Sequence, residues 1–259
     1  MISEWGGRGD RGVVLIGLAC LIILAWLHLL RGAGFEMRAM GADDGQMIGM
    51  MPAWTPGYVV RVAAMWTAMM VAMGLPAAVP AIMLVTSLPR RRPGVLNGAR
   101  AALLFATGSL VVWTAFSVAA ALAQWGLDRS GALSDAMASR GPAVSGPILL
   151  AAGLYQFTPL KDVCLLQCRS PREHVLRASP AGALATIAAG VRYGAVNLGC
   201  CGALMGLMFV GGVMNVSCTA GLTLLVLAEQ ALPWAQPLHR ISGAAFLAWG
   251  SLAIATAIA

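Results

Sequence analysis

Charged residues are scarce in this sequence, and their scarcity argues against a soluble protein. Only 10% of the 259 residues are Asp, Glu, Lys or Arg, whereas 59% are hydrophobic. A soluble domain carries roughly 25% charged residues. The chain therefore lacks the charged surface that a soluble protein of this size requires.

Signatures of catalysis are also missing. The sequence contains no Gly-x-Ser-x-Gly, no phosphate-binding P-loop, no His-Glu-x-x-His and no dinucleotide fingerprint. Its three histidines are scattered, without a His-x-x-x-His pair. We expect a protein that is not an enzyme.

Long apolar runs take the place of charge, and runs of about 20 such residues are typical of membrane spans. They predict an all-α, polytopic transmembrane bundle forming a single integral membrane domain over residues 1–259, with six spans as the alternative to seven. We do not expect the first run to be a cleaved signal peptide, because a small-x-small site close to its apolar end is poorly matched. The seven predicted spans lie near 12–30, 58–88, 98–127, 144–166, 193–212, 214–232 and 241–258.

The basic residues are distributed unevenly between alternate loops. Eleven of the 17 lie before the first span, in the loops around Arg90–Arg92 and Lys161–Arg177, or before the last span, while five lie in the opposite loops. The positive-inside rule then puts the N-terminus in the cytoplasm and the C-terminus outside. We expect a multi-pass protein of a bacterial inner membrane in contact with lipid, and no nucleic acid despite the net charge of +7.

Three segments qualify this topology. Arg192 would be costly at mid-bilayer, so we expect an in-plane or re-entrant segment at 181–190 and a span beginning near Tyr193. Residues 31–57 form a predicted outer loop rich in Met, Gly and Pro. Thr158-Pro159 is expected to end or bend the fourth span, since proline disfavours a helical residue before it.

Four cysteines form two candidate metal-binding pairs. Cys164 and Cys168 are four residues apart, on one helix face, and Cys200 and Cys201 are adjacent. The predicted topology puts both pairs toward the reducing cytoplasm, where a structural disulfide is not expected. Thiolates there bind soft metals such as Cu(I) or Zn(II). The alternative is that each thiol is a small buried hydrophobe.

Methionine is the second source of soft ligands. Met65, Met69 and Met73 are spaced at i, i+4 and i+8 in the outer half of the second predicted span. Thioethers bind Cu(I) where thiols would oxidise, although a methionine stripe also serves as flexible packing.

An acidic residue at membrane depth is the third candidate. Glu229 lies near the inner end of the sixth predicted span, and intramembrane acids are usually paired and often functional. Its candidate partners are Lys161, Arg192 or a bound cation, and the alternative is a solvated position at the interface. Asp162 is expected to pair with nearby basic residues on the surface.

Several stretches resemble a bacterial family of predicted metal-binding integral membrane proteins, a domain of unknown function. The most specific is A-G-L-Y-Q-F-T-P-L-K-D-V-C-L-L-Q-C-R-S-P at 152–171, accompanied by 66–80, 198–215 and 225–230. Gln167 and Asn197 stand where the family often has a further His and Cys. The resemblance implies a metal bound through Cys, Met and acidic positions, which here are Cys164, Cys168, Cys200, Cys201, Met65, Met69, Met70, Met73 and Glu229.

Two functions follow. The first is the handling of a soft metal, with copper as the expected ion: outer methionines collect Cu(I) from a metal-donor protein, and the cysteines with Glu229 receive it. The second is a non-catalytic accessory subunit or assembly factor of a larger membrane protein complex, whose small-residue helix faces are contact surfaces.

Overall fold

The computed structural model describes residues 2–39, 54–87, 98–133, 138–171, 175, 182–213, 215–232 and 235–258. Within these ranges the chain is all-helical and contains no β-strand, as the sequence predicts. The helices are α1 (Ile2–Ala39), α2 (Pro56–Thr86), α3 (Gly98–Arg129), α4 (Pro142–Gln156), α5 (Pro159–Arg169), α7 (Ala183–Gly206), α8 (Met208–Gly211), α9 (Val216–Ala231) and α10 (Ala235–Ile258).

Five helical segments are long and apolar enough to cross a membrane: Arg11–Arg31, Pro56–Thr86, Gly98–Arg129, Ala183–Gly211 and Pro237–Ile258. The pair α4 and α5 gives a sixth if the two helices together make one broken span. The sixth predicted span coincides with α9, which has only 16 residues. The described part of the chain is thus compatible with a multi-pass membrane protein of five or six spans by length and composition.

The fourth predicted span is broken as expected. Helices α4 and α5 are inclined at 64° to each other across Phe157 and Thr158. Thr158 has an extended backbone, and its side chain accepts a hydrogen bond from the backbone N–H of Lys161 at 3.3 Å, which caps α5. The proline at 159 has no N–H to continue α4 and favours the first turn of a new helix. The break therefore directs α5 across α7 instead of along α4.

The other two segments singled out in the sequence are residues 181–190 and the predicted outer loop at 31–57, and the structure describes only part of each. Residues 183–190 are the first turns of α7 and are continuous with Tyr193, so the chain is helical on both sides of Arg192. Their depth in the membrane, in-plane or spanning, stays a prediction. Residues 40–53 of the predicted outer loop lie outside the described residues.

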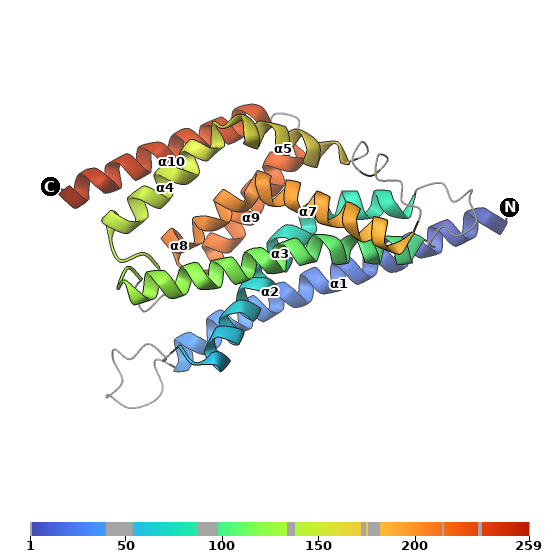
Figure 1. The fold of residues 1–259 in the computed structure, drawn as a ribbon, viewed down its shortest axis with the longest axis horizontal. Helices are drawn as coiled ribbons and strands as arrows, with labels where there is room; N and C mark the ends of the chain where they lie inside the picture. The colour runs from blue at the N-terminus through green and yellow to red at the C-terminus, as the bar shows by residue number, and fades with distance from the viewer. Residues whose placement is uncertain are drawn as a thin grey trace.

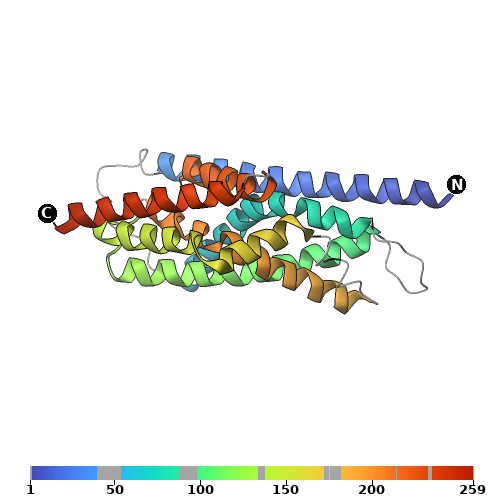
Figure 2. The same cartoon turned by 90° about the horizontal axis from the view of Figure 1, so that it is seen from above.

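The helices run mainly along one long axis, with the two termini at opposite ends (Figures 1 and 2). Helix α4 packs beside α10, and α3 packs beside α7. Contact between α3 and α7 depends on Gly190, because a Cβ atom at that position would overlap the backbone oxygen of Phe105. This close approach fixes α7, which carries Cys200 and Cys201, against the rest of the bundle.

Candidate metal centre

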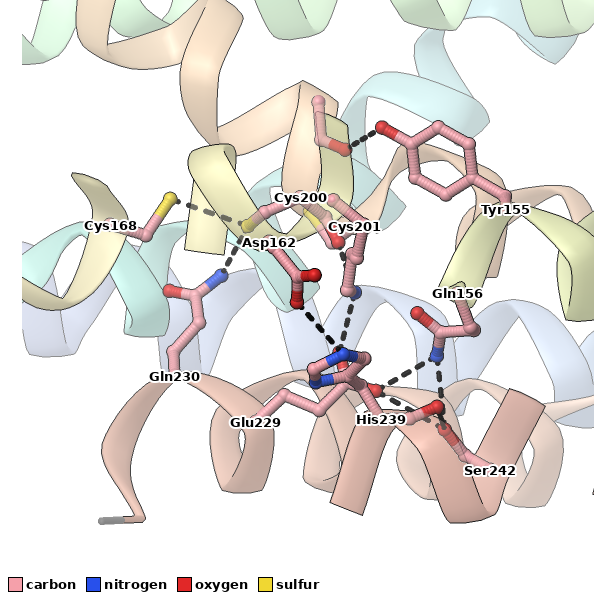
Figure 3. A network of polar contacts seen from close by, with 12 residues as sticks. Tyr155, Gln156, Asp162, Cys168, Cys200, Cys201, Glu229, Gln230, His239 and Ser242 are labelled. Carbon is pink, nitrogen blue, oxygen red and sulfur yellow. Dashed lines mark hydrogen bonds and ion pairs between the residues drawn. The ribbon is translucent and has the colours of Figure 1, made fainter. Parts of the chain in front are cut away.

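Two of the predicted thiols meet between α5 and α7. The sulfur atoms of Cys168 and Cys200 are 3.3 Å apart (Figure 3). Cys168 is 7% exposed and Cys200 is 1% exposed. Two residues 32 positions apart in the chain thus place their sulfurs in contact inside the protein.

A glycine brings the two helices together at this point. A Cβ atom on Gly199 would lie only 2.7 Å from the sulfur of Cys164, so α5 packs on bare backbone. Cys164 itself is buried against that backbone, one helical turn before Cys168. The hydroxyl of Tyr155, at the end of α4, donates a hydrogen bond to the carbonyl oxygen of Gly199. Cys164 is therefore a neighbour of the sulfur pair, and its position serves the close packing of α5 on α7.

Asn197 lies at the centre of the thiols. Its side-chain oxygen is 3.7 Å from the sulfur of Cys200, 3.9 Å from that of Cys168 and 4.0 Å from that of Cys201. The thiol of Cys201 also donates to the backbone oxygen of Asn197 at 2.9 Å, one turn back in α7. Asn197 is fully buried, so its carboxamide is part of the site although it is not a sulfur ligand.

Gln230 completes the surroundings of Cys200 and was not among the residues selected from the sequence. Its side-chain nitrogen lies 3.1 Å from the sulfur of Cys200 and 3.1 Å from the side-chain oxygen of Asn197. The sequence offered one signal for it, which is its position directly after Glu229 in a stretch that resembles the metal-binding family.

Glu229 pairs with Lys161, one of its three candidate partners, and is buried, so the solvated alternative does not apply. The ammonium nitrogen of Lys161 is 2.6 Å from Oε2 of Glu229, and both side chains are at most 2% exposed. Lys161 is the only lysine in the sequence, and it also donates a hydrogen bond to the carbonyl oxygen of Cys200. The ion pair consequently links α5 and α9 to the backbone of Cys200 on α7.

Polar groups from α4 and α10 satisfy the other carboxylate oxygen of Glu229. Gln156 donates to Oε1 at 2.9 Å, and the hydroxyl of Ser242 lies 3.4 Å from the same oxygen (Figure 3). Asp162, for which the sequence predicts a nearby basic surface partner, has its Oδ1 3.1 Å from Nε2 of His239, which is buried on α10. The packing of α10 beside the α4–α5 break brings this distant histidine to it.

The predicted methionine stripe belongs to the same continuous core as the cysteines. Met69 and Met73 of α2 are buried, and Met65 is half-buried and packs on this core. Met205 and Met208, from the end of α7 and from α8, are buried in it as well. Thioethers and thiols that are far apart in the sequence therefore line one uninterrupted interior.

The donor set suits a soft ion that needs few ligands. Among the described residues, no three His, Cys, Asp or Glu side chains converge closely enough to hold a metal. Sulfur ligands favour Cu(I). Two sulfurs that share an ion at about 2.3 Å each, the typical zinc–thiolate distance, are at most about 4.6 Å apart, and the Cys168–Cys200 pair lies within that limit.

The architecture and the buried sulfurs describe a helical protein, compatible with several membrane crossings, that is suited to a soft metal. Residues 63–253 match the PpoB2 family of copper chaperones. This match covers well over half of the chain, so the protein belongs to that family. The match supports copper as the ion, and it includes every predicted ligand from Met65 to Glu229. Comparison with curated proteins and with solved structures gives no match.

Proposed function

We propose that the protein is a membrane-embedded copper chaperone that carries Cu(I) on the sulfurs of Cys168 and Cys200. The observation that carries this proposal is the 3.3 Å contact between these two sulfurs inside the core. Cu(I) prefers soft thiolate and thioether ligands, and a site made of two thiols holds it without the additional oxygen ligands that hard cations need. Such a role is non-catalytic.

The buried methionines supply a route to this pair. Met65, Met69 and Met73 face the core along α2, and Met205 extends the sulfur-rich interior toward Cys200 on α7. Neutral thioethers release Cu(I) more readily than thiolates do, so transfer from methionine to cysteine is favourable. We propose that Cu(I) enters among the methionines and ends on the thiols.

The route has a direction if the N-terminus lies in the cytoplasm. Termini at opposite ends of the long axis (Figure 1) are consistent with an odd number of crossings. Seven crossings require both the α4–α5 pair and α9 to span. Sixteen residues make a helix of about 24 Å, and the bilayer core is about 30 Å thick, so α9 needs a locally thinner bilayer or its flanking residues.

This orientation puts the part of α2 that carries Met65, Met69 and Met73 toward the outside. It therefore indicates on which side a copper donor and a copper acceptor bind. A copper-donor protein on the outer face of a bacterial inner membrane delivers Cu(I) to the methionines. An acceptor on the cytoplasmic side collects it from the cysteines. Cys168, the more exposed thiol of the pair, is the exit ligand.

The test is copper stoichiometry in purified protein. The full chain in detergent, kept reduced, is loaded with Cu(I), freed of excess, and assayed for copper by mass spectrometry and for sulfur ligation by X-ray absorption. We expect about one tightly held Cu(I) per chain, lost in Cys168→Ser and in Cys200→Ser. Cys20→Ser is the matched control, because that thiol is exposed on α1. Retention of sulfur-bound copper in both site variants would refute the proposal.

A further inference from the structure

A side-chain amide outside the sulfur ligands contacts the proposed copper site. We infer that Gln230 is a positioning residue that holds Cys200 in the orientation needed to bind Cu(I), an inference that rests on the function proposed above. Its amide nitrogen lies 3.1 Å from the sulfur of Cys200 and 3.1 Å from the side-chain oxygen of Asn197. Gln230 therefore contacts both the proposed copper ligand, Cys200, and Asn197, which lies among the thiols.

The chemistry of the amide group matches this double contact. A glutamine NH2 group has two hydrogens and no lone pair to offer, so one N–H is directed to each acceptor. The bond to Asn197 fixes the orientation of Gln230, and it also fixes the Asn197 amide with its oxygen toward the thiols. The second N–H is thereby aimed at the sulfur of Cys200.

The backbone around Gln230 is held in place by two independent contacts with α5. The preceding residue, Glu229, forms the buried ion pair with Lys161. Two residues later, the carbonyl oxygen of Leu232 accepts a hydrogen bond from the side chain of Arg169. Both α5 residues flank the segment that carries Cys168, so the donor and the two sulfurs are held on one framework.

A hydrogen bond to sulfur matters most when the sulfur carries charge. A thiolate bound to Cu(I) keeps lone pairs that accept N–H groups, and hydrogen bonds to ionised acceptors are about twice as strong as neutral ones. Partners of this kind orient metal ligands, and their removal typically reduces metal affinity about 10–100-fold. We expect an effect of that size at Gln230, with the two thiols unchanged.

The experiment compares Cu(I) affinity and apo stability in the same variants. Gln230→Leu removes both donors, and Gln230→Glu keeps the shape while replacing the NH2 group by a second carboxyl oxygen. Gln167→Leu is the matched control, since it removes a partly buried glutamine amide beside Cys168. Affinity is measured by competition with a chromophoric Cu(I) chelator in detergent, and apo stability by the thermal unfolding midpoint.

We expect both Gln230 variants to bind Cu(I) about 10–100-fold more weakly, with one copper per chain at saturation and sulfur ligation unchanged by X-ray absorption. Gln167→Leu should stay within twofold of the unaltered protein. A purely structural role predicts instead an affinity loss only in variants whose apo unfolding midpoint falls.

Two results overturn the inference, and they are distinguishable. If the unaltered protein binds Cu(I) through Cys168 and Cys200 and both Gln230 variants bind it equally well, the positioning role is wrong and the proposed function stands. If binding survives Cys168→Ser and Cys200→Ser, or the unaltered protein binds no Cu(I), the proposed function fails and the inference fails with it.

Discussion

Lys161 and Glu229 form an ion pair with 2.6 Å between the ammonium nitrogen and Oε2, inside the bundle and with almost no solvent exposure. The pair joins α5, which carries Cys168, to α9, which carries Gln230. Its charges are neutralised by each other and by the hydrogen bonds from Gln156 and to the Cys200 carbonyl. Variants at Lys161 and Glu229 therefore measure how much this ion pair contributes to the stability of the helices that form the cysteine site.

Removing one partner should destabilise the protein strongly. Glu229→Gln or Lys161→Met leaves an uncompensated buried charge, which costs about 3–5 kcal/mol. Replacing both residues by Met should restore most of this loss, because a buried pair is often neutral relative to apolar residues of similar size. Unfolding of the detergent-solubilised protein measures the effect, with the exposed Arg192→Gln as the control. Equal loss in the single and double variants would show that the two charges are not coupled.

The cysteine contact should be visible as selective disulfide formation. Mild oxidation with diamide is expected to link Cys168 to Cys200, because their sulfurs are 3.3 Å apart and a disulfide needs only a further approach of the sulfurs to about 2 Å. Mass spectrometry of proteolytic fragments identifies the linked peptides. Prior loading with Cu(I) should protect the pair. Links that involve Cys20 or Cys218 in preference to this pair would contradict the observed geometry.

The helix contact at Gly190 should be intolerant of a single methyl group. Gly190→Ala forces α7 away from the Phe105 backbone of α3, and overpacking of this kind typically costs about 1–3 kcal/mol. Copper retention should fall as well, since α7 carries Cys200. Gly206→Ala on the same helix is the matched control, because no described atom other than its chain neighbours and its own helix backbone lies within 4 Å of the Cβ position. Alanine also favours the helix more than glycine does, so stability should be equal or higher. The thermal unfolding midpoint and copper content decide the comparison.

Methionine variants should show whether the thioethers of α2 pass Cu(I) on to the thiols or hold it themselves. Met69→Leu and Met73→Leu conserve volume at buried positions, so each should cost less than about 1.5 kcal/mol. If these thioethers conduct Cu(I) to the thiols, loading slows while the final copper content stays the same. Stopped-flow loading from a Cu(I) donor measures the rate. Met83→Leu, on the same helix but packed against a different core, should have no effect. Equal loading rates in all three variants would exclude a methionine route.

Local sequence was sufficient for the helical architecture. Apolar runs predict helices because a buried or lipid-exposed backbone must satisfy its own hydrogen bonds, and each predicted span coincides with a helix or with the broken pair. Thr158-Pro159 predicts the break, since proline acts on its immediate neighbours. The two cysteine pairs and the methionine stripe were recognisable from residue type and spacing alone.

The pairing of these residues was decided only by the tertiary structure. The sequence placed Cys164 with Cys168 and Cys200 with Cys201, whereas the close contact joins Cys168 to Cys200 across two helices. Gln230 and the Asp162–His239 contact left no comparable pattern in the sequence. Spacing along the chain fixes which face of a helix a residue occupies, but the distance between faces is set by helix packing. Here that packing depends on Gly190 and Gly199, where the absence of a side chain lets α7 lie close to α3 and α5.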